Sequence, residues 1–320
     1  MMKYQLKETV ALPLQPPCEK EIVKKWVDSK EPLVSVVCIT FNHAPYIRHA
    51  INGILNQNTE FPFEIIVRDD ASTDGTAQII KDYLARYRNI IKIFLEKENT
   101  YSKGISPQKA VFEKAKGKYI AYCEGDDYWI GDFKLARQVD VMEADSSIAF
   151  TYHSAVVIDE LGSCIGFKDR QEDMTPNQVV RNPHGIAQVS KMYRNIPNFR
   201  DGNFPINGPT GDSTLNVFMA RFGRVVYVED CGVAVYRVHS GGVWSGLNDL
   251  DKRHMTTLSM LKMYEIVLDT KNEEWIKARE QELCRYLISY NWIYSMRMLF
   301  RVAVGNIYRT CTKLLRKFSR

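Results

Sequence analysis

Short apolar runs and segments with helical periodicity alternate along the first half of the chain. The apolar runs are rich in β-branched residues and have the length of strands covered on both faces of a sheet; they lie at 33–40, 63–67, 90–95 and 119–123. Around them, apolar residues recur every three or four positions, which predicts helices at 46–55, 72–87, 106–115 and 133–144. This order predicts an α/β fold with a doubly wound, mostly parallel sheet and right-handed crossovers.

The second half of the chain is less regular. Strands are expected at 149–158, 225–228 and 233–238. Residues 160–211 contain many polar residues, glycines and prolines, and a connection of this length in a compact domain is usually functional or mobile. From residue 247 onward the pattern is helical, and we expect helices at 250–268 and 273–296.

These patterns divide the chain into three expected parts. Residues 1–31 contain a proline-rich piece and a short charged helix at 19–29, and we expect an N-terminal arm. Residues 32–245 are expected to form the sheet domain. Residues 246–320 are expected to form a C-terminal helical extension.

The last segment, 297–320, has an unusual charge pattern. It combines apolar residues with seven Lys or Arg and no acid. A basic amphipathic helix of this type commonly lies on an anionic membrane surface, which is the interpretation we favour. The alternative is a helix that packs on the domain or on another subunit, with its basic face in water.

Composition and charge limit the class of protein. The 320 residues are 45% hydrophobic and 25% charged, as in ordinary globular proteins, and a net charge of +5 does not indicate nucleic-acid binding. The seven cysteines form no CxxC pairs, which suits a reducing compartment. There is no secretory leader pattern, and no run reaches the ~20 apolar residues that span a bilayer. We expect a cytoplasmic protein that is peripheral on the inner membrane if its tail binds lipid.

Polar residues gather where three of the expected strands end. These clusters are Thr40–Asn42, Asp69–Asp70 and Glu124–Asp127. Each could be an ordinary turn or cap. However, the carboxyl ends of parallel strands lie on one edge of the sheet, where open α/β sheets bind ligands, so we expect one common site. The three carboxylates of the last cluster need a compensating cation, and Mg²⁺ or Mn²⁺ prefers such oxygen ligands, usually together with phosphates.

Three ordered motifs carry a resemblance to a known family. VSVVCITFNHAPYI, IIVRDDASTDGT and GKYIAYCEGDDYW together resemble the nucleotide-sugar domain of the family 2 glycosyltransferases, which have the GT-A fold and invert the anomeric centre. The resemblance covers roughly the first half of the chain. It implies that nucleoside and ribose contact four residues, namely Thr40, Phe41, Asn42 and Asp70. It also implies a metal on Asp126, with Asp127 as a further metal residue and Glu124 beside them, although Glu124 replaces the aspartate that usually begins the D-x-D motif.

Two later residues complete the expected site. Asp212 precedes an expected helix at 214–222, where it could simply be an N-cap. The family resemblance implies instead that it is the base for the acceptor hydroxyl, although its usual acidic neighbour is Gly211 here. His239 lies in a Y-R-x-H segment that resembles the closing motif of the family, where the histidine completes the metal shell or binds the pyrophosphate. A lone histidine is more often structural, but imidazole is an acceptable Mn²⁺ ligand.

The expected function is metal-dependent, inverting transfer of a sugar from a nucleotide-diphosphate sugar, a UDP-sugar by preference. The cofactor is Mn²⁺ or Mg²⁺, and the acceptor is a hydroxyl of a saccharide or lipid-linked acceptor in cell-surface polysaccharide synthesis. One alternative is a non-catalytic, membrane-associated binding or scaffold protein, because Glu124 and Gly211 depart from the family pattern. A sugar nucleotidyltransferase is disfavoured, because the first strand is followed by Thr40–His43 and not by a glycine-rich basic loop.

Overall fold

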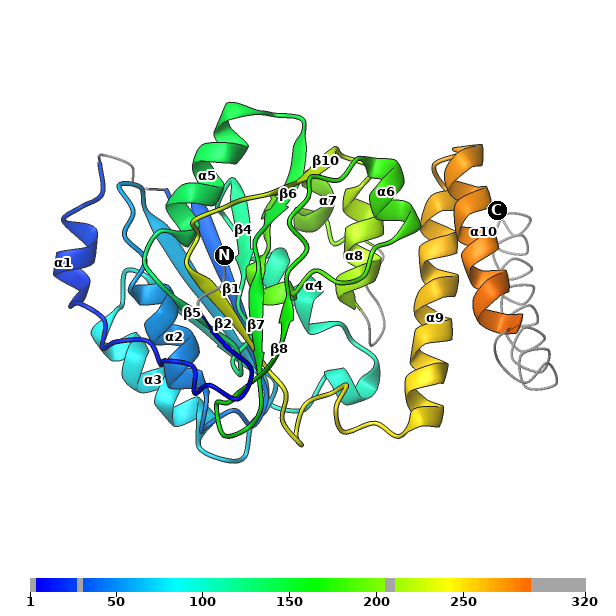
Figure 1. The fold of residues 1–320 in the computed structure, drawn as a ribbon. Coiled ribbons are helices and arrows are strands. Elements are labelled where there is room, and N and C mark those ends of the chain that lie inside the picture. The colour runs from blue at the N-terminus through cyan, green and yellow to red at the C-terminus, as the bar shows by residue number, and fades with distance from the viewer. Residues whose placement is uncertain (1–3, 28–30, 205–210, 289–320) are drawn as a thin grey trace, which may run out of the picture.

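The computed structural model describes residues 4–27, 31–204 and 211–288 (Figure 1). Within these ranges, the larger sheet has the strand order β10-β6-β9-β4-β1-β2-β3. Its strands are β1 (Val34–Thr40), β2 (Phe63–Asp69), β3 (Ile91–Leu95), β4 (Tyr119–Tyr122), β6 (Ile148–Tyr152), β9 (Met192–Arg194) and β10 (Arg224–Tyr227). All of their pairings are parallel except those of β9, which is antiparallel to both neighbours. The predicted mostly parallel α/β sheet is therefore confirmed.

Helices cover both faces of this sheet, because the strands are apolar on both sides. On β1, Val34, Val36 and Cys38 pack in one buried cluster, and Val37 packs in another on the opposite face. The first face is covered by α2 (Ile47–Leu55), α3 (Thr76–Arg86) and α5 (Lys134–Ala144). The second is covered by α4 (Pro107–Phe112), α6 (Pro176–Arg181), α7 (Pro197–Arg200) and α8 (Gly211–Met219).

The single strand expected at 149–158 is two strands. After β6 the chain breaks at His153 and Ser154 and continues as β7 (Ala155–Ile158) in a second sheet of order β5-β11-β7-β8. The other strands of this sheet are β5 (Tyr128–Ile130), β8 (Cys164–Lys168) and β11 (Val233–Arg237). Both halves are strongly apolar, so periodicity gave no sign of the break. The break arises because β6 pairs with β9 and β10, whereas β7 pairs with β8 and β11.

The stretch 160–211 has more structure than its sequence pattern indicated. It contains β8, α6, β9 and α7, as well as a 3₁₀ turn at Gln188–Ser190. The other 3₁₀ turn of the described residues lies outside this stretch, at Tyr101–Lys103. β9 is only three residues long, yet it is an interior strand of the larger sheet, between β6 and β4. A strand this short is too brief for a period of two to be recognised.

The N-terminal segment packs along the domain. Cys164 of β8 exchanges backbone hydrogen bonds with Lys7 and Glu8, so this segment lines the edge of the smaller sheet. It then crosses to the helical face, where the Tyr87 hydroxyl donates to the Pro17 carbonyl at 3.0 Å. The helix expected at 19–29 is shorter, α1 (Glu19–Val23).

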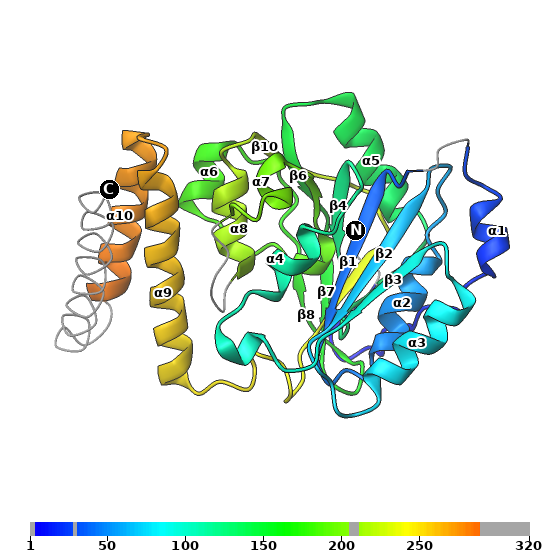
Figure 2. The same cartoon turned by 180° about the vertical axis from the view of Figure 1, so that it is seen from behind.

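Two antiparallel helices, α9 (Asp249–Leu268) and α10 (Glu273–Ile288), stand at the end of the molecule opposite α1 (Figures 1 and 2). α9 packs on α8, and α10 packs on α6. The Trp275 indole donates to Asn177 at 2.5 Å, which ties α10 to α6. The predicted helical extension is therefore present as far as Ile288. The basic segment 297–320 lies outside the described residues, and none of the described helices is both long enough and apolar enough to cross a membrane.

Candidate active site

A cavity of about 590 Å³ lies at the carboxyl edge of β1, β2 and β4. Six of the residues singled out from the sequence line it: Thr40, Phe41, Asp70, Glu124, Asp126 and Asp212. Segments separated by more than 100 residues therefore contribute to one hollow. The structure brings the three strand ends together at one site, as the parallel topology predicts.

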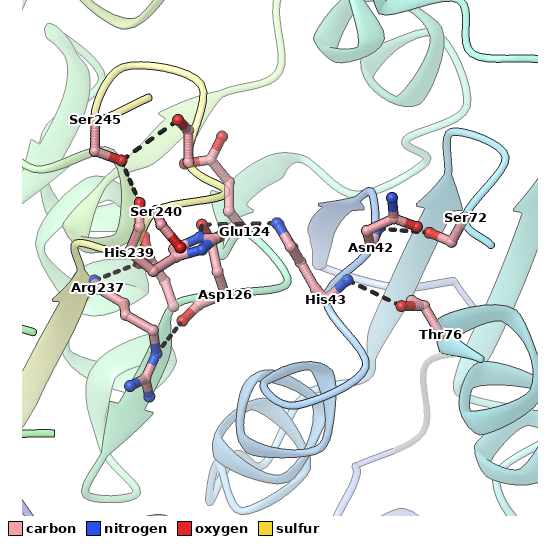
Figure 3. Close-up of polar contacts among 12 residues, drawn as sticks. Asn42, His43, Ser72, Thr76, Glu124, Asp126, Arg237, His239, Ser240 and Ser245 are labelled. Atoms are coloured by element: carbon pink, nitrogen blue, oxygen red, sulfur yellow. Dashed lines mark hydrogen bonds and ion pairs between the residues drawn. The ribbon is translucent and has the colours of Figure 1, made fainter. Parts of the chain in front are cut away.

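Two histidines lie against Asp126; His43 lines the cavity with Asp126, whereas His239 is not among the lining residues. The Oδ2 atom of Asp126 is 3.0 Å from Nε2 of His239 and 3.8 Å from Nε2 of His43. One ligand atom from each residue lies within 4.8 Å of the other two. Figure 3 shows the two imidazole rings reaching Asp126 from different segments of the chain. Sequence reasoning named Asp126 and His239 but missed His43, although it directly follows the first polar strand end.

The charges of this group suit cation binding. Burial acts to raise the pKa of Asp126, but His43 and the hydrogen bond from His239 outweigh it, so the pKa lies below its ordinary value. Burial lowers the pKa of His43, despite the opposing effect of Asp126. An ionised carboxylate and a neutral imidazole are the forms that bind Mn²⁺ or other divalent cations.

The loop that carries His43 is held by the second motif. Asn42 has a φ of 54°, in the left-handed region that asparagine tolerates better than most residues. Its side-chain carbonyl accepts from the Thr73 N–H at 2.8 Å, and its own N–H donates to Ser72 Oγ at 2.8 Å. The His43 N–H donates to Thr76 Oγ1 at 2.9 Å (Figure 3). Asn42 is not among the residues lining the cavity, so its visible contribution is to shape this loop.

Asp70 positions a different wall of the cavity. Its Oδ1 atom accepts from the Thr100 hydroxyl at 2.6 Å, and Oδ2 accepts from the Tyr101 N–H at 3.0 Å. Arg68 pairs with the same carboxylate at 3.2 Å. Burial acts to raise the pKa of Asp70, but these hydrogen bonds and Arg68 outweigh it, so the pKa lies below its ordinary value. Tyr101 itself lines the cavity, so Asp70 both faces the site and fixes a neighbouring wall.

Asp127 lies apart from the group formed by Asp126, His43 and His239. Its side chain is buried and accepts the Arg237 backbone N–H through Oδ1 at 2.9 Å, while Oδ2 has no hydrogen-bond partner among the described residues. It is neither part of the three-residue group nor of the cavity lining. The prediction that Asp127 is a metal ligand is therefore not supported by its position. Its visible contact joins the acidic loop to the end of β11, two residues before His239.

Arg237 fixes the same junction from the other side. Its guanidinium lies 4.6 Å from the centre of the Tyr46 ring, and its Nε donates to the Asp126 carbonyl at 3.1 Å. The residue is only 5% exposed. Arg237 thus fixes the backbone of Asp126 and the end of β11 together, which holds His239 beside the carboxylate.

A buried lysine, Lys191, lies near the acidic wall of the cavity, which is formed by Glu124 and Asp212. Its ammonium donates to Gln188 and Asn216 at 2.9 Å each, and it is fully buried between β9 and α8. Burial lowers the pKa of Lys191 to about 8, and the charges of Asp212 and Glu124 oppose that shift. Burial also raises the pKa of Glu124 to about 8, assisted by Asp126 and Asp212. Sequence reasoning missed Lys191, because β9 was not recognised.

Asp212 lies in the first turn of α8, one residue inside the helix. One of its carboxylate oxygens accepts the Ser213 N–H at 2.7 Å. Asp212 and Asp126 line the same cavity. The residue expected to be the base and the residue expected to hold the metal therefore face one site.

Comparison with known proteins agrees with this geometry. Residues 35–202, more than half of the chain, match the family model described as glycosyl transferase family 2. An uncharacterized protein of Mycobacterium tuberculosis is 35% identical over 219 residues, which are 66% of this chain and 60% of that protein. The Escherichia coli protein WfaP, named a UDP-Glc:α-D-GlcNAc-diphosphoundecaprenol β-1,3-glucosyltransferase, is 35% identical over 121 residues, 38% of this chain and 45% of WfaP. The chain thus spans less than two thirds of the length of these relatives.

Two solved structures share the fold. TarS residues 1–349 of Staphylococcus aureus, in complex with UDP-GlcNAc, superposes with a TM-score of 0.59 at 21% identity, covering 81% of this chain and 73% of that one. The mannosyltransferase PcManGT of Pyrobaculum calidifontis, in complex with GDP-Man and Mn²⁺, gives 0.53 at 17% identity, covering 92% and 88%. At these identities the likeness shows the fold, which is of the GT-A type. The chain belongs to glycosyltransferase family 2.

Proposed function

We propose that this chain transfers a sugar, with inversion, from a nucleotide-diphosphate sugar to a hydroxyl of a saccharide or lipid-linked acceptor in cell-surface polysaccharide synthesis. A UDP-sugar is the favoured donor, because WfaP is named for UDP-Glc and TarS was solved with UDP-GlcNAc. The observation that carries the proposal is the convergence of Thr40, Asp126 and Asp212 on one cavity of about 590 Å³. That volume is in the range of pockets that enclose ligands of this size.

The residues around Asp126 fit a divalent cation. They offer one carboxylate oxygen and two imidazole nitrogens within 4.8 Å of one another, and such a mixed set suits Mn²⁺. We therefore assign Asp126, His239 and His43 as the residues that would hold Mn²⁺ or Mg²⁺. A cation bound there would neutralise the charge that develops on the departing diphosphate.

The other residues would orient the two substrates. Thr40 and Phe41, at the end of β1, would contact the nucleoside, and Asp70 would face the ribose while fixing the segment with Tyr101. Asp212 would accept the proton of the attacking acceptor hydroxyl as that oxygen bonds to the anomeric carbon from the face opposite the diphosphate. The bond from the anomeric carbon to the diphosphate breaks in the same reaction, and the nucleoside diphosphate leaves with the bonding electrons.

The test is release of nucleoside diphosphate from a panel of UDP- and GDP-sugars in the presence of Mn²⁺. We expect one donor to be consumed by the wild type, and Asp126→Asn and Asp212→Asn to lower the rate by on the order of 100-fold or more. Asp140→Asn changes an exposed carboxylate on α5, away from the cavity, and should match the wild type. Equal activity of the wild type and the two site variants would refute the assigned roles.

A binding protein without activity would give a different result. In that case a nucleotide sugar with Mn²⁺ would raise the melting temperature, because a ligand of the native state stabilises it, but no nucleoside diphosphate would be released.

A further inference from the structure

The cavity has a second wall, to which sequence reasoning assigned only Asp212. This wall comes from the turn after α6, from the first turn of α8 and from one face of α9. Its residues include His184, Ile186, Asp212, Ser213, Ser259 and Met263. None of these segments belongs to the end of β1, where the nucleoside is proposed to bind. The wall is therefore separate from the proposed nucleoside site.

His184 is fixed next to Asp212 by a short chain of hydrogen bonds. Its Nδ1 atom is 2.9 Å from the Ser213 hydroxyl, and the Ser213 backbone N–H donates to the Asp212 carboxylate at 2.7 Å. The turn that carries His184 is anchored on the same helix, because Asn216 donates to the Pro183 carbonyl at 2.8 Å. Ser213 is therefore hydrogen-bonded both to the His184 imidazole and to the Asp212 carboxylate, and it holds the two side chains at the first turn of α8.

The His184 ring keeps one polar atom for a ligand. His184 is an exposed residue whose ring is partly buried, and this burial lowers its pKa despite the opposing charge of Asp212, which favours the neutral ring. A neutral imidazole has one donor and one acceptor nitrogen. Within the described residues the ring makes only the hydrogen bond to Ser213, and the residue lines the cavity. Nε2 therefore has no hydrogen-bond partner among the described residues, and His184 belongs to the cavity lining.

We propose that His184, oriented by Ser213, binds the acceptor at an oxygen next to the hydroxyl that Asp212 deprotonates. The inference rests on the proposed function and specifies its acceptor. Two polar groups this close on one wall match a molecule that carries oxygens on adjacent carbons, as a saccharide ring does. Ile186 and Met263 are also part of this wall, but they are only 5% and 0% exposed, so the polar groups carry the proposal. The acceptor end is therefore a saccharide, and a simple alcohol lacks the second oxygen.

The test compares transfer to a sugar with hydrolysis by water in the same enzyme. The assay uses the UDP-sugar that the wild type consumes, Mn²⁺ and a panel of methyl pyranosides, each with its monodeoxy analogues. We expect His184→Ala to raise the acceptor KM about tenfold, the effect of one lost hydrogen bond in a binding site. Donor KM and UDP release into water should remain within about twofold of the wild type. Ser213→Ala should act in the same direction, and His184→Gln should restore part of the acceptor affinity.

The control is His254→Ala, an exposed histidine on α9 that does not line the cavity. Melting temperatures of all variants show whether a variant has lost a ligand contact or has lost its fold. If His184→Ala does not fold, His184→Gln, which keeps a hydrogen-bond donor, takes its place in the test. An unchanged acceptor KM in His184→Ala would overturn the proposal, as would a parallel loss of hydrolysis and transfer. UDP release into water with no transfer to any pyranoside would overturn the saccharide assignment. Failure of the proposed function looks different, because the wild type would then release no nucleoside diphosphate from any UDP- or GDP-sugar, and both proposals would fall.

Discussion

Gly125 lies between the acidic residues of the third motif, and a side chain at this position would meet close neighbours on β1. A Cβ atom there would lie 2.7 Å from both Cβ and Oγ1 of Thr40 and 3.0 Å from Nδ1 of His43. The backbone of Gly125 is not in the left-handed region, so the obstacle is contact alone. Gly125→Ala therefore tests how closely the loop after β4 approaches β1 at the site.

The size of the expected loss in the free energy of unfolding follows from how little the neighbours of Gly125 can move. Carbon atoms in contact are about 3.5–4.0 Å apart, so the new methyl group would overlap Thr40 by about 1 Å. Thr40 is 1% exposed and pairs with Asp69 in the sheet, while the Gly125 N–H donates to the Ile39 carbonyl at 2.9 Å. Both backbones are thus held, and we expect a loss of about 1–3 kcal/mol in the free energy of unfolding. His43 should also shift away from Asp126 and weaken Mn²⁺ binding.

Urea unfolding and Mn²⁺ titration of the purified chain measure the two effects. We expect Gly125→Ala to lower the urea midpoint with an unchanged slope and to raise the Kd for Mn²⁺. The matched control is Gly166→Ala on β8, where the nearest atom to a new Cβ is 4.0 Å away; it should unfold like the wild type. If both variants have the wild-type midpoint and Mn²⁺ affinity, the close approach of Gly125 to Thr40 is refuted.

Three further predictions concern the charged residues of the site. Asp126→Asn should abolish Mn²⁺ binding measured by calorimetry, whereas Asp127→Asn should retain it, because the amide oxygen of the new side chain can still accept the Arg237 N–H; equal loss in both would show Asp127 to be a ligand. The pKa of Glu124 is raised from 4.5 to about 8 in the folded protein. In the absence of metal, its contribution to the free energy of unfolding is therefore fully present below pH 4.5 and is lost as the pH rises through 8. Glu124→Gln should therefore flatten the fall of the urea midpoint across that range in EDTA, and an unchanged slope would contradict the raised pKa. Lys191→Met, which leaves the acidic wall without its buried cation, should lower the melting temperature more than Lys262→Met on the partly exposed surface of α9; equal melting temperatures would contradict a structural charge at Lys191.

Local sequence was sufficient for the strands and for the residues at their ends. The runs at 33–40, 63–67 and 119–123 are apolar on both faces, which only a covered parallel sheet accommodates, and β1, β2 and β4 lie there. Because such strands share one carboxyl edge, the gathering of Thr40, Asp70 and Asp126 followed from topology alone.

The partners of these residues depended on contacts that no local pattern records. His43 became a candidate ligand only because the loop after β1 lies against the end of β11, almost 200 residues later in the chain. Asp127 looked like a ligand beside Asp126, but neighbouring residues of a turn can point to different sides, and its carboxylate meets the Arg237 backbone.

By itself, the sequence determined the parallel sheet, the edge at which its polar residues gather and the family to which the motifs belong. The tertiary structure decided where the run 149–158 breaks and how the three residues of β9 enter the sheet between β6 and β4. It also decided that His43 and His184 line the cavity and that Lys191 is buried against Asn216 of α8. The physical reason is the range of the interactions. Periodicity arises from neighbouring residues of one element, whereas strand pairing and side-chain contacts join elements that are far apart in the chain.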